Sequence, residues 1–490
     1  RNLGGKMTIT VEVEISNREI RSFGKLIATA FELAMEFGRK LVVRALEHKD
    51  QELAETRDRK RFRCKGKRQT SIKTILGVIE ISRNVYVDNA APEGGKCVYL
   101  LDEELEIEKV GLVSEDVCQA AATAVCESTY RGAAKMITET TGLSISAQGV
   151  WNIIQKLGAK RKAQIEQQAK QAVNHRSTGV IESKLLYEEN DGVWLKLQGE
   201  SRRKYGSGKE MKVGIAYDGA TWQIGKDKKK RRTLDSKVAY ASFENARDFM
   251  RNKEGLVASR FNVDEIELRV INGDGAQWIR KHGDANCISV LDKFHRNKKI
   301  TECVRDPEFA ALVRKLLYAG RIEDTLACIE AQINSVADEQ EKTLLRELYS
   351  YYANNKDALL GYYDRGVTIP PTRLPGEIHH ARLGSMESNV FTLIGNRMKG
   401  RRACWSENGA NNLALILCAY HTTGMENLFS VTVPASTVTN ETPSMDTKAS
   451  AGNTPAAEGR GYHFWSSGSI SAAWARNVTG LTSFTEMSYT

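Results

Sequence analysis

The sequence predicts a multidomain α/β protein. Helical and β domains precede a core with a mixed five-stranded sheet, and an all-α insertion interrupts that core. Three observations predict this organisation. A chain of 490 residues is too long for one hydrophobic core. Between residues 180 and 295, runs of alternating apolar residues are followed by helical spacing. Between residues 296 and 383, the apolar spacing is helical throughout.

The N-terminal segment, residues 1–56, is predicted to contain a strand and a long helix. Apolar and polar residues alternate over residues 8–15, which is typical of a strand. From Asn17 to His48 the apolar residues recur at helical spacing, which indicates an amphipathic helix. Two interpretations of this helix remain. It packs against its own domain, or it pairs with a second copy as a dimer-forming arm.

Residues 57–112 begin with a basic run and are predicted to form a small β unit. The apolar residues that follow the run predict two short strands that turn near Gly77. The basic residues are Arg61, Arg63, Lys65, Lys67 and Arg68. This density of positive charge favours contact with DNA phosphates, which would be independent of sequence and sensitive to salt. A solvated charged surface is the alternative.

Residues 113–175 are predicted to form a helical domain that resembles a helix-turn-helix. A helix from Tyr130 to Thr140 and a helix from Ala147 to Leu157 flank a turn that contains Gly142. In such a motif the second helix enters the major groove. Its polar residues Gln148, Asn152 and Lys156 could contact bases or phosphates. A plain helical hairpin is the alternative.

Residues 176–295 are predicted to form the first part of the core. The apolar run Leu185–Tyr187 is expected to be a strand that delivers Asp191 to its exposed end, and residues 193–197 alternate as in a strand. The further expected elements are strands at 211–217 and 238–243, a helix at 245–261, a strand that ends at 274, a short helix at 277–282 and a strand at 287–291. Three strands followed by helix, strand, helix and strand is the element order of an RNase H-like fold. In that fold the first and fourth strands are neighbours at the sheet centre.

A basic hairpin tip lies between the second and third of these strands. It contains Lys228, Lys229, Lys230 and Arg231. Two interpretations of this tip remain, namely a solvated loop and a site of contact with DNA phosphates.

The remaining chain is divided into three predicted segments. Residues 296–383 form a helical insertion domain, and residues 384–430 return to the core with a helix at 388–398 and another at 409–420. Arg401 and Arg402 add a basic patch. Residues 431–490 are rich in Ser, Thr, Ala, Gly and Pro, and we expect a low-complexity tail.

Three acidic residues are candidates for a metal site. Asp191 and Asp274 each follow a strand-like run and precede a glycine, and Glu387 begins a helix after the insertion. Cleavage of a phosphodiester requires an activated oxygen nucleophile and neutralised phosphate charge, which two divalent ions provide. Hard cations such as Mg²⁺ prefer carboxylate ligands. The alternatives are turn or cap roles for the aspartates, and Glu377 or Glu407 as the third acid.

The composition narrows the class of protein. Lys and Arg number 71 against 61 Asp and Glu, a net charge of +10 that favours a polyanionic partner. No apolar run approaches the roughly 18 residues that a membrane span needs. The nine cysteines have no zinc-site spacing, and their scattered positions favour reduced thiols in a cytosol.

Several motifs together resemble bacterial insertion-sequence transposases of the DDE type, in the Mutator-like group. They are Arg63-Cys-Lys-Gly-Lys-Arg68, Tyr130-Arg-Gly-Ala-Ala134, Asn190-Asp-Gly192, Gly273-Asp-Gly-Ala-Gln-Trp278, Leu291-Asp-Lys-Phe-His295 and the Glu387 helix with Trp405. The members of this group commonly carry Cys or Asp, two residues and then His after the second catalytic acid. Asp292-Lys-Phe-His295 fits that pattern.

The resemblance implies Asp191, Asp274 and Glu387 as a catalytic and metal-binding triad, with His295 as a further catalytic candidate that positions DNA or water. It implies two Mg²⁺ ions, with Mn²⁺ as a substitute. The expected activity is nicking of DNA at the terminal inverted repeats and transfer of the 3′-OH into target DNA. A homodimer or larger assembly on paired ends in the bacterial cytoplasm, at the nucleoid, is also expected. The alternatives are a catalytically silent DNA-binding protein and a structure-selective nuclease.

Overall fold

The computed structural model divides into two compact units, Arg1–Lys156 with Phe429–Thr490, and Leu157–Leu428. Structure is described for residues 15–16, 19–91, 95–105, 107, 113–173, 179–224, 228–280, 286–373, 383–400, 402–422 and 424–429. The predicted tail at 431–490, Arg401 and all of the predicted strand at 8–15 except Ile15 lie outside these residues.

The long N-terminal helix of the first unit, α1, spans Phe23–Thr56 and follows the short helix η1, Glu19–Arg21. Ser22 caps α1, because its hydroxyl accepts a hydrogen bond from Lys25 N at 3.2 Å. The prediction of a long helix is therefore confirmed, with a later start and a later end than the apolar spacing indicated.

An antiparallel sheet packs against α1. It contains β1 (Phe62–Thr74), β2 (Gly77–Asp88) and β3 (Lys96–Val98), and α2 (Leu100–Glu104) follows. Val42, Val43, Leu46 and Leu53 of α1 pack on a core that includes Ile72, Ile79 and Ile81. The predicted pair of strands that turn near Gly77 is confirmed, but the strands are 13 and 12 residues long rather than short. The run itself lies within β1, because extended backbone exposes charged side chains on the open face of this sheet.

Three helices complete the described part of the first unit, namely α3 (Glu115–Glu127), α4 (Tyr130–Thr140) and the start of α5 (Ala147–Val173). Thr129 caps α4 by accepting a hydrogen bond from Gly132 N at 3.1 Å. The turn between α4 and α5 passes Gly77, whose φ of +117° favours glycine. A Cβ on Gly142 would meet the carbonyl oxygen of Leu76 at 2.4 Å, so this approach also requires a glycine.

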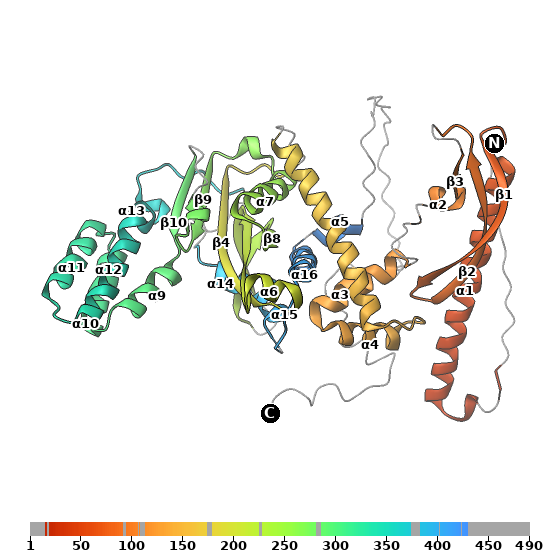
Figure 1. Cartoon of the computed structure of the whole chain (residues 1–490), viewed down its shortest axis with the longest axis horizontal. Helices are drawn as coiled ribbons and strands as arrows, with labels where there is room; N and C mark the ends of the chain where they lie inside the picture. The colour runs from red at the N-terminus through yellow and green to blue at the C-terminus, as the bar shows by residue number, and fades with distance from the viewer. Residues whose placement is uncertain are drawn as a thin grey trace, which may run out of the picture. The chain divides into compact units, whose positions relative to one another are not determined.

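A mixed five-stranded sheet is the centre of the second unit (Figure 1). Its order is β10 (Cys287–Leu291), β9 (Leu268–Gly273), β4 (Leu185–Lys196), β5 (Gly208–Tyr217) and β8 (Val238–Ser242). The strand β4 pairs parallel with β9 and antiparallel with β5. The predicted first and fourth strands are therefore neighbours at the centre of the sheet.

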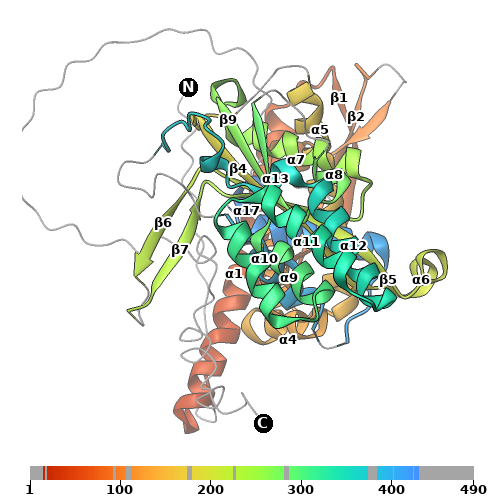
Figure 2. The ribbon, with the colours of Figure 1, turned by 90° about the vertical axis from the view of Figure 1, so that its left-hand side faces the viewer.

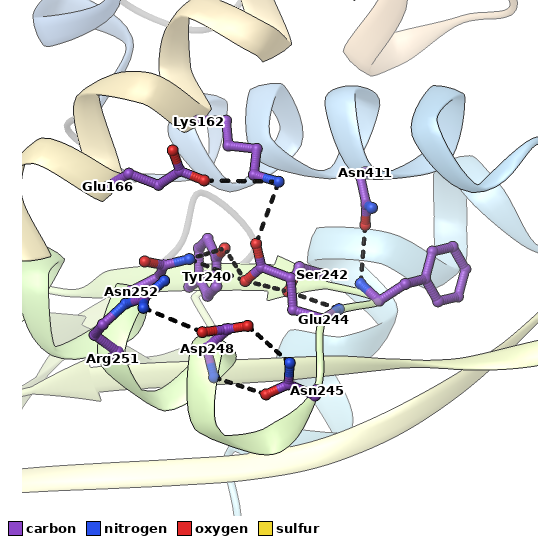
Figure 3. A network of polar contacts seen from close by, with 11 residues as sticks. Lys162, Glu166, Tyr240, Ser242, Glu244, Asn245, Asp248, Arg251, Asn252 and Asn411 are labelled. Carbon is purple, nitrogen blue, oxygen red and sulfur yellow. Dashed lines mark hydrogen bonds and ion pairs between the residues drawn. The ribbon is translucent and has the colours of Figure 1, made fainter.

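One face of this sheet is covered by α7 (Ala246–Arg260), and α16 (Glu407–Tyr420) packs on β8. A polar network ties these elements to α5 (Figure 3). Glu244, which follows β8, accepts hydrogen bonds from Tyr240 Oη at 2.7 Å and Asn252 Nδ2 at 3.0 Å, and it pairs with Lys162 of α5 at 3.5 Å. Asn411 of α16 accepts a hydrogen bond from Phe243 N at 2.8 Å.

Several elements of this unit were not predicted. A short helix, α6 (Gly199–Tyr205), connects β4 to β5. The strands β6 (Gly219–Ile224) and β7 (Lys230–Asp235) form a separate antiparallel hairpin that extends away from the five-stranded sheet (Figure 2). Lys230 and Arg231, expected in a hairpin tip, therefore belong to a strand.

The helical spacing predicted after residue 296 is confirmed for most of the described residues up to 364, which form a helical bundle at the β10 edge of the sheet (Figure 1). Its elements are α9 (Lys293–Cys303), α10 (Pro307–Tyr318), α11 (Ile322–Ser335), α12 (Glu339–Asn354), α13 (Lys356–Leu359) and η3 (Tyr362–Asp364). The bundle has its own core, which includes Val313, Ile329, Leu348 and Tyr352. Tyr351 connects the bundle to the end of β9, since its Oη donates to the carbonyl of Asp274 at 2.7 Å. Within the bundle, Tyr352 Oη donates to the carbonyl of Arg296 in α9 at 3.0 Å.

The chain returns to the sheet through short helical segments. The predicted helix at 388–398 is divided into α14 (Met386–Val390), the π-helical segment η4 (Phe391–Gly395) and α15 (Asn396–Met398). The helix α17 (Gly424–Phe429) follows α16, and α8 (Gln277–Arg280) and η2 (Val263–Glu265) complete the described elements. Across the described residues, no helix combines the length and apolar character that crossing a membrane requires.

Candidate metal centre

The central strand β4 carries Asp191 to the candidate site. Pairing with β9 ends at Glu189 and Asn272, so Asp191 lies just beyond the end of its parallel neighbour. Pairing with β5 continues to Lys196. The prediction that Asp191 ends a strand was therefore wrong, because the antiparallel partner extends β4 through Gly192. The Asp191 residue is 9% exposed, and its Oδ1 accepts a hydrogen bond from Gly192 N at 2.7 Å.

His295 reaches the same place from the helix after β10. Asp292 caps this helix, since its Oδ1 accepts hydrogen bonds from Phe294 N at 2.9 Å and His295 N at 3.2 Å. His295 Nε2 lies 3.6 Å from Asp191 Oδ2. The interaction with Asp191 raises the pKa of the imidazole above its ordinary value, although burial acts in the opposite direction.

Glu387 lies in the first turn of α14, where the sequence predicted a helix start. The two residues before this helix are held by a buried carboxylate of β4. Gly384 N donates to Glu189 Oε2 at 2.9 Å, and Ser385 N donates to the same oxygen at 3.1 Å. These bonds place the start of α14 beside β4.

Asp191, His295 and Glu387 form one group. Each offers a ligand atom, and the three atoms lie within 4.8 Å of one another. All three line a cavity of about 20 Å³, which is room for a single water molecule or ion. Two carboxylates fit Mg²⁺ or Mn²⁺, with water completing the coordination. The imidazole adds a nitrogen ligand that softer divalent cations prefer.

Asp274, the predicted second acid, is not in this group. It directly follows β9, and its Oδ1 accepts a hydrogen bond from Ala276 N at 2.8 Å. Its charge still acts at the site, because it contributes to the raised pKa of His295. The structure therefore brings together three of the four predicted catalytic residues and holds the fourth next to them in a turn.

A further carboxylate, Glu210 of β5, was missed from the sequence. Burial raises its pKa above the ordinary value, and the charges of Asp274 and Asp191 act in the same direction, while Lys212 opposes them. A Cβ on Gly192 would lie 2.1 Å from Glu210 Oε1. The glycine after Asp191 thus leaves room for this carboxylate, which would have to move to admit a larger residue there.

Glu189 and Asn272 were also missed as parts of the site, and Asp292 was named only as the first residue of the motif that ends at His295. A signal was present in Glu188-Glu189-Asn190-Asp191, which is a polar run inside a central strand. Such a run is costly to bury unless every side chain finds partners. On the opposite face of the sheet, Lys253 meets that need by pairing with Glu188 at 2.6 Å and donating to Asn190 Oδ1 at 2.8 Å.

The predicted DNA-binding residues of the first unit lie on exposed surfaces. Arg63, Lys65, Lys67 and Arg68 are exposed on β1, where the register shifts between Cys64 and Lys67. Arg61 differs, because its guanidinium forms two hydrogen bonds with Asp88, at 3.1 and 2.9 Å.

The polar residues predicted on the second helix of the helix-turn-helix-like segment are also exposed. Gln148, Asn152 and Lys156 lie on α5, with Trp151 between them. Gln148 Nε2 donates to Asn152 Oδ1 at 3.0 Å, one turn along the helix.

The basic residues predicted for the second unit lie in two places. Lys228, Lys229 and Arg231 are exposed at the β6–β7 hairpin, and Lys230 begins β7. Arg402 is exposed and has a φ of +55°. The candidate Arg401 lies outside the described residues.

The sequence matches one protein family over residues 17–428, the uncharacterised protein family UPF0236. A UPF0236 protein of Caldanaerobacter subterraneus subsp. tengcongensis is 24% identical over 396 residues, which are 79% of this chain and 79% of that protein. A second protein of that organism has the same identity over the same length, covering 79% of this chain and 78% of that protein, and its name joins eleven locus designations. A UPF0236 protein of Streptococcus gallolyticus, described as lying in the vanSb 3′ region, is 21% identical over 448 residues, 89% of this chain and 91% of that protein.

Proposed function

We propose that this chain, which belongs to the uncharacterised protein family UPF0236, is a DNA transposase of the DDE type. It nicks DNA at the ends of a mobile element and joins the 3′-OH to target DNA, with divalent cations at Asp191 and Glu387. The observation that carries the proposal is the approach of Asp191, His295 and Glu387 to within 4.8 Å.

The topology of the second unit supports this proposal. The strand order β10-β9-β4-β5-β8 has the first and fourth strands of the segment paired at the centre. That is the order expected of an RNase H-like core. The helical bundle of α9–α13 lies between β10 and the helix of Glu387, where the resemblance to Mutator-like transposases implies an insertion.

Each residue of the site would have its own role in the reaction. Asp191 and Glu387 would hold a cation, which when bound neutralises charge that develops on the phosphate. His295, beside Asp191, would orient the scissile phosphate or a water molecule through its ring nitrogen. Asp274 would complete a second cation position by releasing Ala276 N and turning toward Asp191.

The positive charge on the surface and the names of the relatives support the proposal that this chain acts on a mobile DNA element. Exposed Arg63, Lys65 and Arg68 on β1 provide positive charge for a DNA backbone. A relative whose name joins eleven loci is what the multiplication of one gene within a genome would produce. Two element ends must be held together for joining, so the working form would be a homodimer or larger assembly on DNA in the bacterial cytoplasm.

The test is a cleavage and joining assay with purified protein, duplexes that carry the element ends, and Mg²⁺ or Mn²⁺. Asp191→Asn and Glu387→Gln should abolish both nicking and joining. Glu407→Gln is the matched control, because Glu407 also begins a helix but pairs with Lys209 outside the site. It should retain activity.

Three results would redirect the assignment. An active Asp191→Asn protein would overturn the proposed site. Cutting without joining would favour a structure-selective nuclease. Salt-sensitive DNA binding with no metal-dependent cutting would favour a silent DNA-binding protein.

A further inference from the structure

Glu189 is a buried carboxylate two residues before Asp191 on the same face of β4. Its exposed fraction is 0%. It accepts hydrogen bonds from Tyr217 Oη at 2.8 Å, Asn272 Nδ2 at 2.8 Å, Gly384 N at 2.9 Å, and Ser385 N at 3.2 and 3.1 Å to its two oxygens. Both oxygens are thus occupied by donors, so Glu189 is not itself placed to bind a cation.

The backbone donors to Glu189 come from the segment that begins the Glu387 helix. Gly384 and Ser385 directly precede α14, and Ser385 is its N-cap residue. Both amides point to one carboxylate on the central strand. Glu189 therefore fixes the position of Glu387 relative to Asp191 on that same strand.

A second arm of the network reaches the helix of His295. Asn272 lies directly opposite Glu189 in the parallel β4–β9 pair. Its Nδ2 donates to Glu189 Oε2 at 2.8 Å and to Asp292 Oδ2 at 2.9 Å. The other oxygen of Asp292 caps the helix of His295. One chain of hydrogen bonds thus connects the three segments that carry Asp191, His295 and Glu387.

We propose that Glu189 is a positioning residue that sets the cation affinity of the site. It does so by holding Glu387 directly, and His295 through Asn272 and Asp292, at ligand distance from Asp191. The inference rests on the proposed function only in taking these three residues as cation ligands. Residues that orient metal ligands from behind typically change metal affinity by about 10- to 100-fold when they are removed.

The network also predicts which substitutions will matter. Glu189→Gln keeps the size of the side chain but replaces one acceptor oxygen with an amide donor, which would face N–H or O–H donors. Glu189→Asp keeps the charge but shortens the reach to Gly384 and Ser385. Asn272→Ala removes one donor to Glu189 and the connection to Asp292. It leaves the bonds from Gly384 and Ser385 to Glu189 in place, so its effect should be smaller.

Glu188→Gln is a matched control on the neighbouring position. Glu188 is 2% exposed, and its carboxylate points to the opposite face, where it pairs with Lys253 at 2.6 Å and Arg269 at 3.1 Å. Its replacement disturbs a buried carboxylate of the same strand without touching Gly384 or Ser385. A general loss of stability would appear in both variants, whereas a loss of cation binding should appear only with Glu189.

The experiment measures Mn²⁺ binding to the full chain without DNA, by calorimetric titration and by the paramagnetic resonance of free Mn²⁺. Thermal unfolding followed by circular dichroism verifies that each variant is folded. Glu189→Gln and Glu189→Asp should bind Mn²⁺ about 10- to 100-fold more weakly than the wild type. Asn272→Ala should lose less. Glu188→Gln should stay within about 2-fold, because its partners Lys253 and Arg269 lie on the opposite face of the sheet.

Hydrogen exchange of the peptide around residues 384–390 gives a readout that does not depend on cations. Its first amides should exchange faster in Glu189→Gln and stay protected in Glu188→Gln. Wild-type Mn²⁺ affinity in folded Glu189→Gln would overturn the inference, as would a wild-type chain that binds no Mn²⁺. DNA cleavage is not part of this test, so a failure of the transposase function would appear separately.

Discussion

Nε2 of His295 lies 3.6 Å from Oδ2 of Asp191, and this pair connects the helix after β10 to the central strand. The carboxylate favours the charged imidazole, which raises the pKa of His295. A raised pKa in the folded state means that the pair stabilises the fold fully below the unfolded pKa of about 6.5. That contribution is lost as the pH rises through the folded pKa.

The first prediction follows from this pair. In Asp191→Asn the pKa of His295 should fall, because the main interaction that raises it is removed while the opposing effect of burial stays. The measurement is a pH titration of histidine-labelled protein by NMR, with divalent cations removed by a chelator. An unchanged or higher pKa of His295 in the variant would contradict the geometry.

The second prediction concerns Asp274, which lies outside the three-ligand group. Asp274→Asn keeps the oxygen that accepts the Ala276 N–H, so the turn should fold as before. Mn²⁺ binding at Asp191 and Glu387 should remain within a few-fold of wild type. Metal-dependent DNA cleavage should fall by about 10²- to 10³-fold, the usual loss when one group that stabilises transition-state charge is removed. Full cleavage activity would mean that the site works without Asp274.

The sequence predicted the strands of the core better than it predicted the geometry of the site. Alternating residues such as Met211, Val213 and Ile215 mark β5, because one-residue alternation is a local property. The position of Asp191 within β4 depended instead on the length of its antiparallel partner. The length of that partner strand cannot be predicted from the residues next to Asp191 in the sequence.

The approach of Glu387 to Asp191 was predicted from element order and family resemblance. The role of Glu189 was not predicted, because its partners Gly384 and Ser385 lie 195 and 196 positions further along the chain. A basic hairpin tip was predicted between β5 and β8, but the strands β6 and β7 that flank it were not. The run of charges around Arg231 was assigned to the tip, whereas charged side chains on a two-stranded hairpin can stay in solvent.

The third prediction concerns the basic face of β1. A triple variant with Arg63→Ala, Lys65→Ala and Arg68→Ala should bind all DNA duplexes more weakly. The slope of log K against log salt concentration should decrease by about 0.9 for each phosphate that the variant no longer neutralises. Fluorescence anisotropy at several salt concentrations measures this slope.

Two controls accompany that triple variant. Arg61→Ala should change the salt slope less, because Arg61 is paired with Asp88. A triple variant of equal charge change, with Lys25→Ala, Lys40→Ala and Lys135→Ala, corrects for net charge alone. Equal weakening in both triple variants would argue against a specific DNA-binding face on β1.

The fourth prediction separates base recognition from backbone contact on α5. Asn152→Ala should reduce the preference for element ends over unrelated duplex, because an amide side chain can bond to a base edge with about 1–3 kcal/mol of discrimination. Lys156→Ala should weaken binding to both duplexes alike. Competition assays with the two duplexes distinguish these outcomes. An unchanged preference in Asn152→Ala would favour the plain helical hairpin.

The fifth prediction concerns an exposed apolar seam on α1 and η1. The seam consists of Ile20, Phe23, Ile27, Ala30, Ala34, Phe37 and Leu41, each of which is exposed. Their spacing alternates between three and four residues, which is the heptad pattern of a coiled coil. A coiled-coil seam requires a helical partner with matching spacing, and a second copy of this chain supplies one. We therefore expect two copies to pair along α1, as the proposed joining of two DNA ends would require.

The test of this seam compares two variants of equal charge change. Phe23→Glu together with Phe37→Glu puts two negative charges into the seam and should convert dimers to monomers. Lys25→Glu changes the net charge by the same amount on the outer face of the helix, where it should leave the dimer intact. Mass photometry and analytical ultracentrifugation measure the outcome. A wild-type chain that stays monomeric at micromolar concentration, or a seam variant that still dimerises, would show that α1 is not the dimer contact.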